Sequence, residues 1–102
     1  MLEKLQAEGN AETRVEAAFR LGETYRAQGL HEDAAEAYMT AAYLGSQSKW
    51  GRRALLAAGQ SFLALKDARS AAIVYRKLVA QPNAEPELTE EATKALQQLG
   101  QR

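Results

Sequence analysis

Apolar residues along this chain recur every three or four positions, which is the spacing of one face of an α-helix. Turn and capping residues divide the pattern into five segments of helical length. Asn10 and Asp67 precede two segments as expected N-caps, and Gly29, Gly45 and Gly100 follow three as terminators. The predicted helices cover residues 11–28, 31–44, 50–65, 68–80 and 86–99. The pattern therefore predicts an all-α fold.

The chain also resembles itself at an offset of 37 residues, with residues 14–45 aligning on residues 51–82. One period of this length holds two helices. A lone helix pair cannot bury its apolar face, so such pairs stack on one another. Small or aromatic residues match at Ala17 and Ala54, Gly22 and Gly59, Tyr25 and Phe62, Ala27 and Ala64, Ala34 and Ala71, Ala35 and Ala72, and Tyr38 and Tyr75. We expect a short solenoid forming one domain over residues 1–102.

The register divides this domain into two repeats with flanking helices. Residues 11–45 form the first repeat, residues 50–81 the second, and residues 86–99 a C-terminal capping helix. Residues 1–8 are expected either as the tail of a preceding helix, which would make the chain an excerpt of a longer array, or as an N-terminal cap. Within the pairs, Gly22 is expected to face Ala34, and Gly59 to face Ala71, so that the helices approach closely.

The repeated residues resemble a known family. The run Leu21-Gly22-x-x-Tyr25, followed by Gly29, Ala34, Tyr38 and Ala41, resembles the tetratricopeptide repeat pattern, and the second copy keeps most of it. Departures are Ala18 and Leu55 in place of an early tryptophan, and Lys66 in place of a turn glycine. The 37-residue spacing is similar to that of bacterial envelope members, such as the periplasmic repeat protein beside the Tol-Pal system and the outer-membrane assembly lipoprotein.

The resemblance implies a right-handed superhelix of antiparallel helix pairs (an α-α superhelix) that binds proteins and is not an enzyme. In such a superhelix, the first helix of each pair lines a concave groove. A peptide or helix of a partner would bind there. The alternative for Phe19 and Leu56 is that they pack between helices as part of the core. The groove positions are Glu16, Phe19, Glu23, Arg26, Arg53, Leu56, Gln60 and Leu63.

The formal net charge is zero, but the charges are unevenly placed. Residues 1–45 carry 8 acids and 4 bases, residues 46–81 carry 1 acid and 7 bases, and residues 82–102 carry 4 acids and 2 bases. The basic second repeat is either a set of solvated helix faces, a docking surface for an acidic partner, or part of a self-association contact. Self-association through the exposed ends of the solenoid is the alternative function, and it would produce homo-oligomers.

Other chemistry has little support in the sequence. The chain has no cysteine, and His31 is its only histidine, so we expect no catalytic set, no metal site and no cofactor. The run from Ser48 to Arg53 places Trp50 among basic residues, which is a pattern for nucleic acid or anionic surfaces, but the zero net charge disfavours this function. No apolar run is long enough to span a bilayer. As written the chain is expected to be cytoplasmic, or periplasmic if it is an excerpt of an exported protein.

Overall fold

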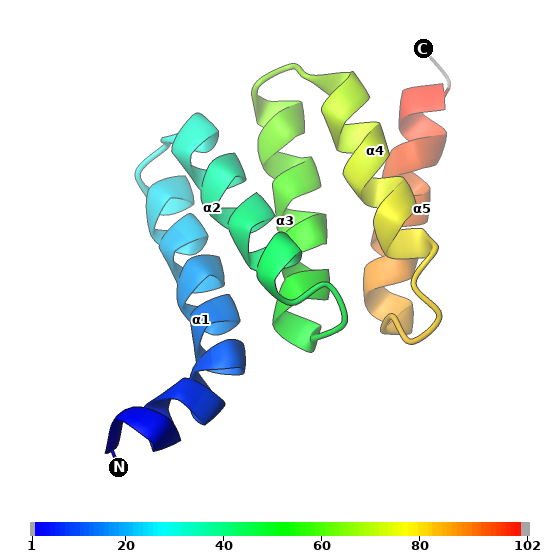
Figure 1. Cartoon of the computed structure of the whole chain (residues 1–102). Helices are drawn as coiled ribbons and strands as arrows, with labels where there is room; N and C mark the ends of the chain where they lie inside the picture. The colour runs from blue at the N-terminus through cyan, green and yellow to red at the C-terminus, as the bar shows by residue number, and fades with distance from the viewer. Residues whose placement is uncertain (1, 101–102) are drawn as a thin grey trace.

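The computed structural model describes residues 2–100, with side chains over residues 12–100. This part of the chain contains five α-helices and no strand, so the predicted all-α fold is confirmed. Consecutive helices run in opposite directions (Figure 1). The helices are α1 (Leu2–Ala27), α2 (His31–Leu44), α3 (Lys49–Ala64), α4 (Ala68–Val79) and α5 (Pro86–Gly100).

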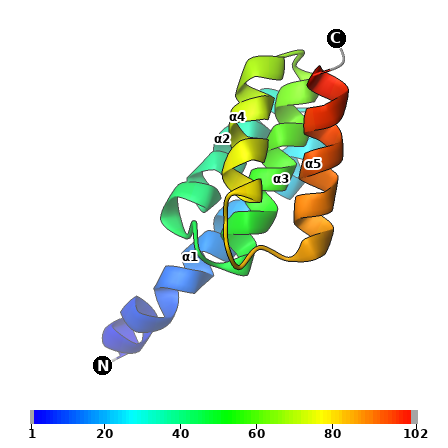
Figure 2. The same ribbon diagram turned by 90° about the vertical axis from the view of Figure 1, so that its right-hand side faces the viewer.

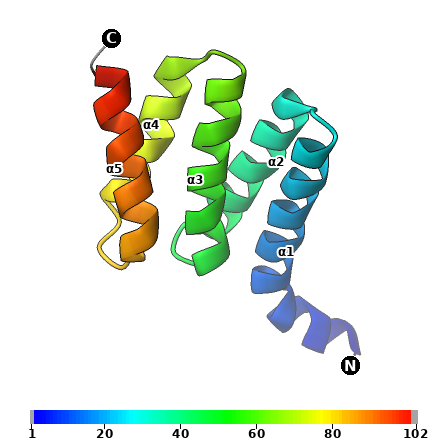
Figure 3. The ribbon, with the colours of Figure 1, turned by 180° about the vertical axis from the view of Figure 1, so that it is seen from behind.

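The helices lie in two layers, seen edge-on in Figure 2 and from behind in Figure 3. In one layer α3 contacts both α1 and α5. The other layer holds α2 and α4, which make no contact with each other within the described part of the chain. Each helix also packs on the next one in sequence, and the molecule is elongated, with extents of 55 × 32 × 18 Å. The two layers therefore differ: one is continuous, whereas the other is interrupted between α2 and α4.

Glycine permits close packing within each helix pair. A β-carbon at Gly22 would stand 2.6 Å from Cδ1 and Cε1 of Tyr38, which is closer than real contacts allow. Gly59 meets the ring of Tyr75 in the same way, 37 residues later. Both tyrosines are almost completely buried and are the largest side chains of the core. The repeat found in the sequence is thus also a repeat of a specific packing contact.

The atoms nearest to these glycines come from tyrosines that stand one helical turn after the alanines expected to face them. Gly22 was expected to face the region of Ala34, and the three atoms nearest to a β-carbon there all belong to Tyr38. At Gly59, expected to face Ala71, they all belong to Tyr75. Side chains on a helix lean toward its N-terminus and cover the turn before their own Cα. The ring of Tyr38 therefore reaches back over the turn that begins at Ala34, which is itself fully buried.

The helix ends follow ordinary capping chemistry. The Ser48 hydroxyl accepts a 3.0 Å hydrogen bond from the Gly51 amide at the start of α3. The Asp67 carboxylate accepts a 3.1 Å bond from the Ser70 amide at the start of α4, so the predicted Asp67 cap is confirmed. The bounds predicted for α2 agree with the structure, and those of α3 and α4 differ by one residue or less at each end.

The start of the first helix differs from the prediction. Asn10 was expected to cap a helix over residues 11–28, yet α1 is continuous from Leu2 to Ala27. Glycine and asparagine are weak helix formers but do not remove a backbone donor as proline does, so Gly9 and Asn10 do not end the helix. The first turns bend away from the other helices (Figures 1 and 3). Of the predicted tail over residues 1–8, Met1 and all side chains lie outside the described part.

Candidate interaction face

The eight predicted groove residues lie on α1 and α3, which are neighbours in the continuous layer (Figure 3). They differ in exposure. Glu23, Arg26, Arg53 and Leu63 are exposed, and Glu16, Phe19, Leu56 and Gln60 are partly buried. Phe19 and Arg53 meet at a shared neighbour, Trp50, whereas Leu63 lies further along the layer.

On α1 the predicted charged residues already have partners within the chain. The carboxylate of Glu16 accepts from Arg20 one turn later, with Nη2 2.7 Å from Oε2. The carboxylate of Glu23 accepts a 2.6 Å hydrogen bond from the Tyr38 hydroxyl and lies 3.9 Å from the guanidinium of Arg26. These side chains form a polar surface on α1, and the ion pair between Arg26 and Glu23 is long and exposed.

Phe19 joins α1 to both neighbouring helices. Its ring centroid lies 5.7 Å from that of Tyr38 on α2 and 5.6 Å from that of Trp50 on α3, and both pairs are tilted. These are favourable geometries for aromatic pairs. Phe19 and Leu56 also pack against the buried core cluster. Phe19 and Leu56 are therefore partly buried residues at the edge of the core, and both keep some exposed surface.

Trp50 is surrounded by three cations, and the sequence indicated only two of them. The charged groups of Arg20, Lys49 and Arg53 lie 5.4, 5.4 and 5.3 Å from the centre of its ring. Each distance is within the range of a cation–π interaction. The run of bases around Trp50 indicated Lys49 and Arg53, but Arg20 comes from another helix and no local pattern predicts it.

Further along α3, Leu63 lies beside α5. Leu63 borders a hollow of about 280 Å³ together with Ala95 and Leu99 of α5. Gln60 takes the place in the second repeat that Glu23 takes in the first. Within the predicted set, Phe19 and Arg53 therefore lie at Trp50, Glu23 and Arg26 lie near Tyr38, and Leu63 lies beside α5.

Two buried tyrosine hydroxyls have raised pKa values. Burial, and then the hydrogen bond to Glu23, raise the pKa of Tyr38 to about 12, although Arg26 opposes the shift. Burial also raises the pKa of Tyr75, and the negative charge of Glu91 adds to this shift. Both hydroxyls therefore stay protonated at neutral pH, and Tyr38 acts as a hydrogen-bond donor.

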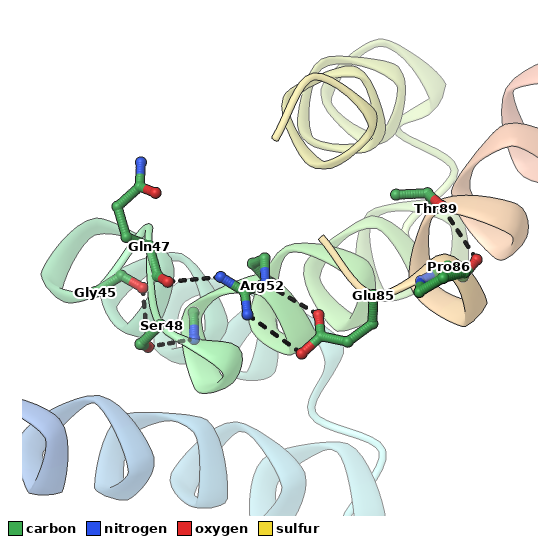
Figure 4. Close-up of polar contacts among 8 residues, drawn as sticks. Gly45, Gln47, Ser48, Arg52, Glu85, Pro86 and Thr89 are labelled. Atoms are coloured by element: carbon green, nitrogen blue, oxygen red, sulfur yellow. Dashed lines mark hydrogen bonds and ion pairs between the residues drawn. The ribbon is translucent and has the colours of Figure 1, made fainter. Parts of the chain in front are cut away.

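Arg52 forms an ion pair with Glu85 within the molecule (Figure 4). Its Nε and Nη2 donate to the two carboxylate oxygens of Glu85 at 3.0 and 3.2 Å, and Nη1 donates to the backbone carbonyl of Gln47. This side chain is only 12% exposed. Of the three basic residues that a polyanion would need, Lys49 and Arg53 are exposed, whereas Arg52 fastens the start of α3 to the segment before α5.

A larger hollow than the one beside Leu63 lies on the opposite layer, where no site was predicted. It measures about 640 Å³ and separates α2 from α4. Met39, Tyr43 and Leu55 line it with apolar surface, and Lys77 and Gln81 add polar groups. The sequence gives no direct signal for it, because it results from the missing contact between α2 and α4.

Comparisons of the chain with models of protein families, with curated proteins and with solved structures give no match. In the described part of the chain, no group of three or more histidine, aspartate or glutamate side chains is arranged to hold a metal ion. None of the described helices is both long enough and apolar enough to cross a bilayer. A functional assignment therefore depends on the geometry of this chain and on its internal repeat.

Proposed function

We propose that the chain is a tetratricopeptide-like repeat domain, a right-handed superhelix of antiparallel helix pairs, that acts as a non-enzymatic protein-interaction module. In this proposal a peptide or a helix of a partner protein binds the layer formed by α1, α3 and α5. The 37-residue period and the Gly22–Tyr38 contact, which recurs at Gly59 and Tyr75, support the repeat assignment. Repeat domains of this kind use an extended face for recognition.

One observation carries the functional part of the proposal: three buried pairs of residues are identical in the two repeats, whereas all four pairs on the proposed binding face differ. The interior pairs Gly22 and Gly59, Ala34 and Ala71, and Tyr38 and Tyr75 are identical and buried. The face pairs are Glu16 and Arg53, Phe19 and Leu56, Glu23 and Gln60, and Arg26 and Leu63. The differences give the two halves of this face distinct charge and polarity, which recognition of a particular partner segment requires.

The cluster around Trp50 indicates what the partner offers. Trp50 and Phe19 present aromatic surface, and Lys49 and Arg53 form no ion pair within residues 12–100. Cations that surround an aromatic ring favour a ligand that combines an apolar side chain with carboxylates. We therefore expect the bound segment to carry an apolar anchor flanked by acidic residues.

Trp50 is the only tryptophan of the chain, so its fluorescence reports binding at this face. A displayed library of random 16-residue peptides would be selected against the full chain, and the selected peptides titrated against it. We expect a change in Trp50 emission, and a dissociation constant at least tenfold higher for Arg53→Ala and for Leu56→Ala. Asn83→Ala, in the loop before α5, is the control and should bind as the parent chain does.

Two outcomes would contradict the proposal. One is that the selection yields no peptide with saturable binding. The other is that Arg53→Ala, Leu56→Ala and Asn83→Ala all bind the selected peptides equally well, which would place the binding surface elsewhere. Circular dichroism of each variant separates a lost contact from a lost fold.

A further inference from the structure

The layer that the proposed function leaves unused, formed by α2 and α4, carries an exposed aromatic residue beside a hollow. Tyr43 is 87% exposed, the highest value among the large apolar and aromatic side chains of the described chain. It stands at the edge of the 640 Å³ hollow between α2 and α4. On α4, Ile73 is 47% exposed and borders a second hollow, between α4 and α5. Exposed aromatic and aliphatic groups at the rim of a hollow are typical of interaction surfaces.

The two helices of this layer carry opposite charges on their outer surfaces. On α2, Glu32, Asp33 and Glu36 are exposed. On α4, the exposed charged side chains are Arg69, Arg76 and Lys77. None of these six side chains forms an ion pair with another part of residues 12–100. An acidic helix and a basic helix thus belong to the same layer (Figure 2), with the hollow between them, and their exposed charges form no ion pairs among the described side chains.

We propose that this face pairs with the same face of a second copy of the chain. A twofold axis requires a self-complementary surface, because each element must meet its counterpart on the other copy. Rotation about an axis through the hollow places the acidic α2 of one copy over the basic α4 of the other, and does so twice. The same rotation brings each Tyr43 toward the hollow of the partner copy.

A second copy fits this surface better than a partner of a single charge. An acidic ligand would be attracted by α4 and repelled by α2, and a basic ligand would meet the reverse. Only a partner that places basic residues over α2 and acidic residues over α4 complements the whole face. A second copy of the chain carries both kinds of helix. This contact differs from association through the ends of the stack, and it leaves the α1–α3–α5 layer open for the proposed peptide.

Charge reversal with complementary variants tests the proposal. One variant, Glu32→Lys with Glu36→Lys, makes α2 basic, and the other, Arg76→Glu with Lys77→Glu, makes α4 acidic. Each should lose the dimer, because like charges then face each other twice. An equimolar mixture should regain it, because each changed helix meets a changed helix of opposite sign. Molar mass is measured by light scattering and by sedimentation, over a concentration series at low and high salt.

We expect the parent chain to reach twice its 11.2 kDa mass as concentration rises, and its dissociation constant to increase at least tenfold at high salt. Tyr43→Ala should weaken the dimer without any change of charge. The control is Glu87→Lys with Glu90→Lys on α5, which makes the same charge change in the other layer and should dimerise as the parent does.

Three results would overturn the proposal. The parent chain could stay at 11.2 kDa up to millimolar concentration. Both charge-reversed variants could dimerise as the parent does, which would place the contact at the ends of the stack or at the Trp50 face. The mixture of variants could remain monomeric although both variants are folded by circular dichroism. Peptide binding is measured separately by Trp50 fluorescence, so none of these results alone contradicts the proposed function.

Discussion

Lys66 holds the backbone conformation that Gly29 holds one repeat earlier. Both residues have positive φ, 63° for Lys66 and 78° for Gly29. In both turns the amide of the next residue, Leu30 or Asp67, donates to the carbonyl five residues back, at 2.9 and 2.8 Å. This bond belongs to the Schellman motif that ends many helices. The second repeat therefore keeps the turn of the first although it lacks the glycine that the turn favours.

The first prediction concerns this turn. A side chain with a β-carbon is strained at positive φ, and glycine is not, so Lys66→Gly should raise the free energy of unfolding by about 0.5 to 1 kcal/mol. For a domain of this size, such a change shifts the melting temperature by roughly 2 to 8 °C. Lys66→Ala is the control, because it removes the long side chain and keeps the strain. A melting temperature for Lys66→Gly at or below that of Lys66→Ala would contradict the prediction.

The second prediction concerns the glycines under the tyrosine rings. Gly22→Ala and Gly59→Ala should each destabilise the chain by about 1 to 3 kcal/mol, because the new methyl group overlaps the buried ring of Tyr38 or Tyr75. Alanine is otherwise the better helix former by about 1 kcal/mol. Gly100→Ala is a matched control, since a β-carbon there meets nothing within 4 Å. Urea unfolding followed by circular dichroism gives all three values. Equal stability of the three variants would mean that the helices move apart to accept the methyl group at little cost in free energy.

Helix positions could be predicted from this sequence because their signals are local. The period of apolar residues, the Asp67 cap and the turn residues Gly29 and Gly45 defined most helix bounds to within a residue. The offset of 37 residues also identified Gly22 and Tyr38 as repeated positions. Local patterns were weakest near Gly9 and Asn10, where two poor helix formers suggested an end and the surrounding residues maintained the helix.

Contacts between helices could not be predicted with the same detail. Which residue meets Gly22 depends on the direction of a side chain, and the arrival of Arg20 at Trp50 depends on how α1 and α3 are rotated about their axes. The hollow beside Tyr43 depends on a missing contact, which leaves no pattern in the sequence. Sequence periodicity identifies the buried side of a helix but does not fix its neighbours.

The third prediction concerns stability at high pH. Because the pKa of Tyr38 is about 12 in the folded chain and near 10 when unfolded, the unfolded state releases its proton first as pH rises. The contribution of Tyr38 is fully present below about pH 10 and is lost between roughly pH 10 and 12. Thermal unfolding of the parent chain and of Tyr38→Phe across this range tests the effect. The parent should lose more stability than the variant, and parallel losses would show that Tyr38 titrates as an ordinary tyrosine.

The fourth prediction concerns the ion pair between Arg52 and Glu85. Glu85→Gln should cost about 1 kcal/mol at pH 7, because the guanidinium of Arg52 is nearly buried and loses its charged acceptor, while the partial exposure of Glu85 limits the effect. Arg52 lowers the pKa of the Glu85 carboxyl, so its contribution is present above about pH 4 and is lost as pH falls through the folded value.

Urea unfolding at pH 7 and pH 3 measures this contribution. The stability difference between the parent chain and Glu85→Gln should shrink toward pH 3, because protonation of the Glu85 carboxyl removes the charge that the glutamine variant lacks. Glu16→Gln is the control, because it breaks an exposed pair one helical turn apart and should cost only about 0.3 to 0.5 kcal/mol at pH 7. A difference for Glu85→Gln that stays constant between the two pH values would mean that Arg52 holds the segment before α5 without help from the charge of Glu85.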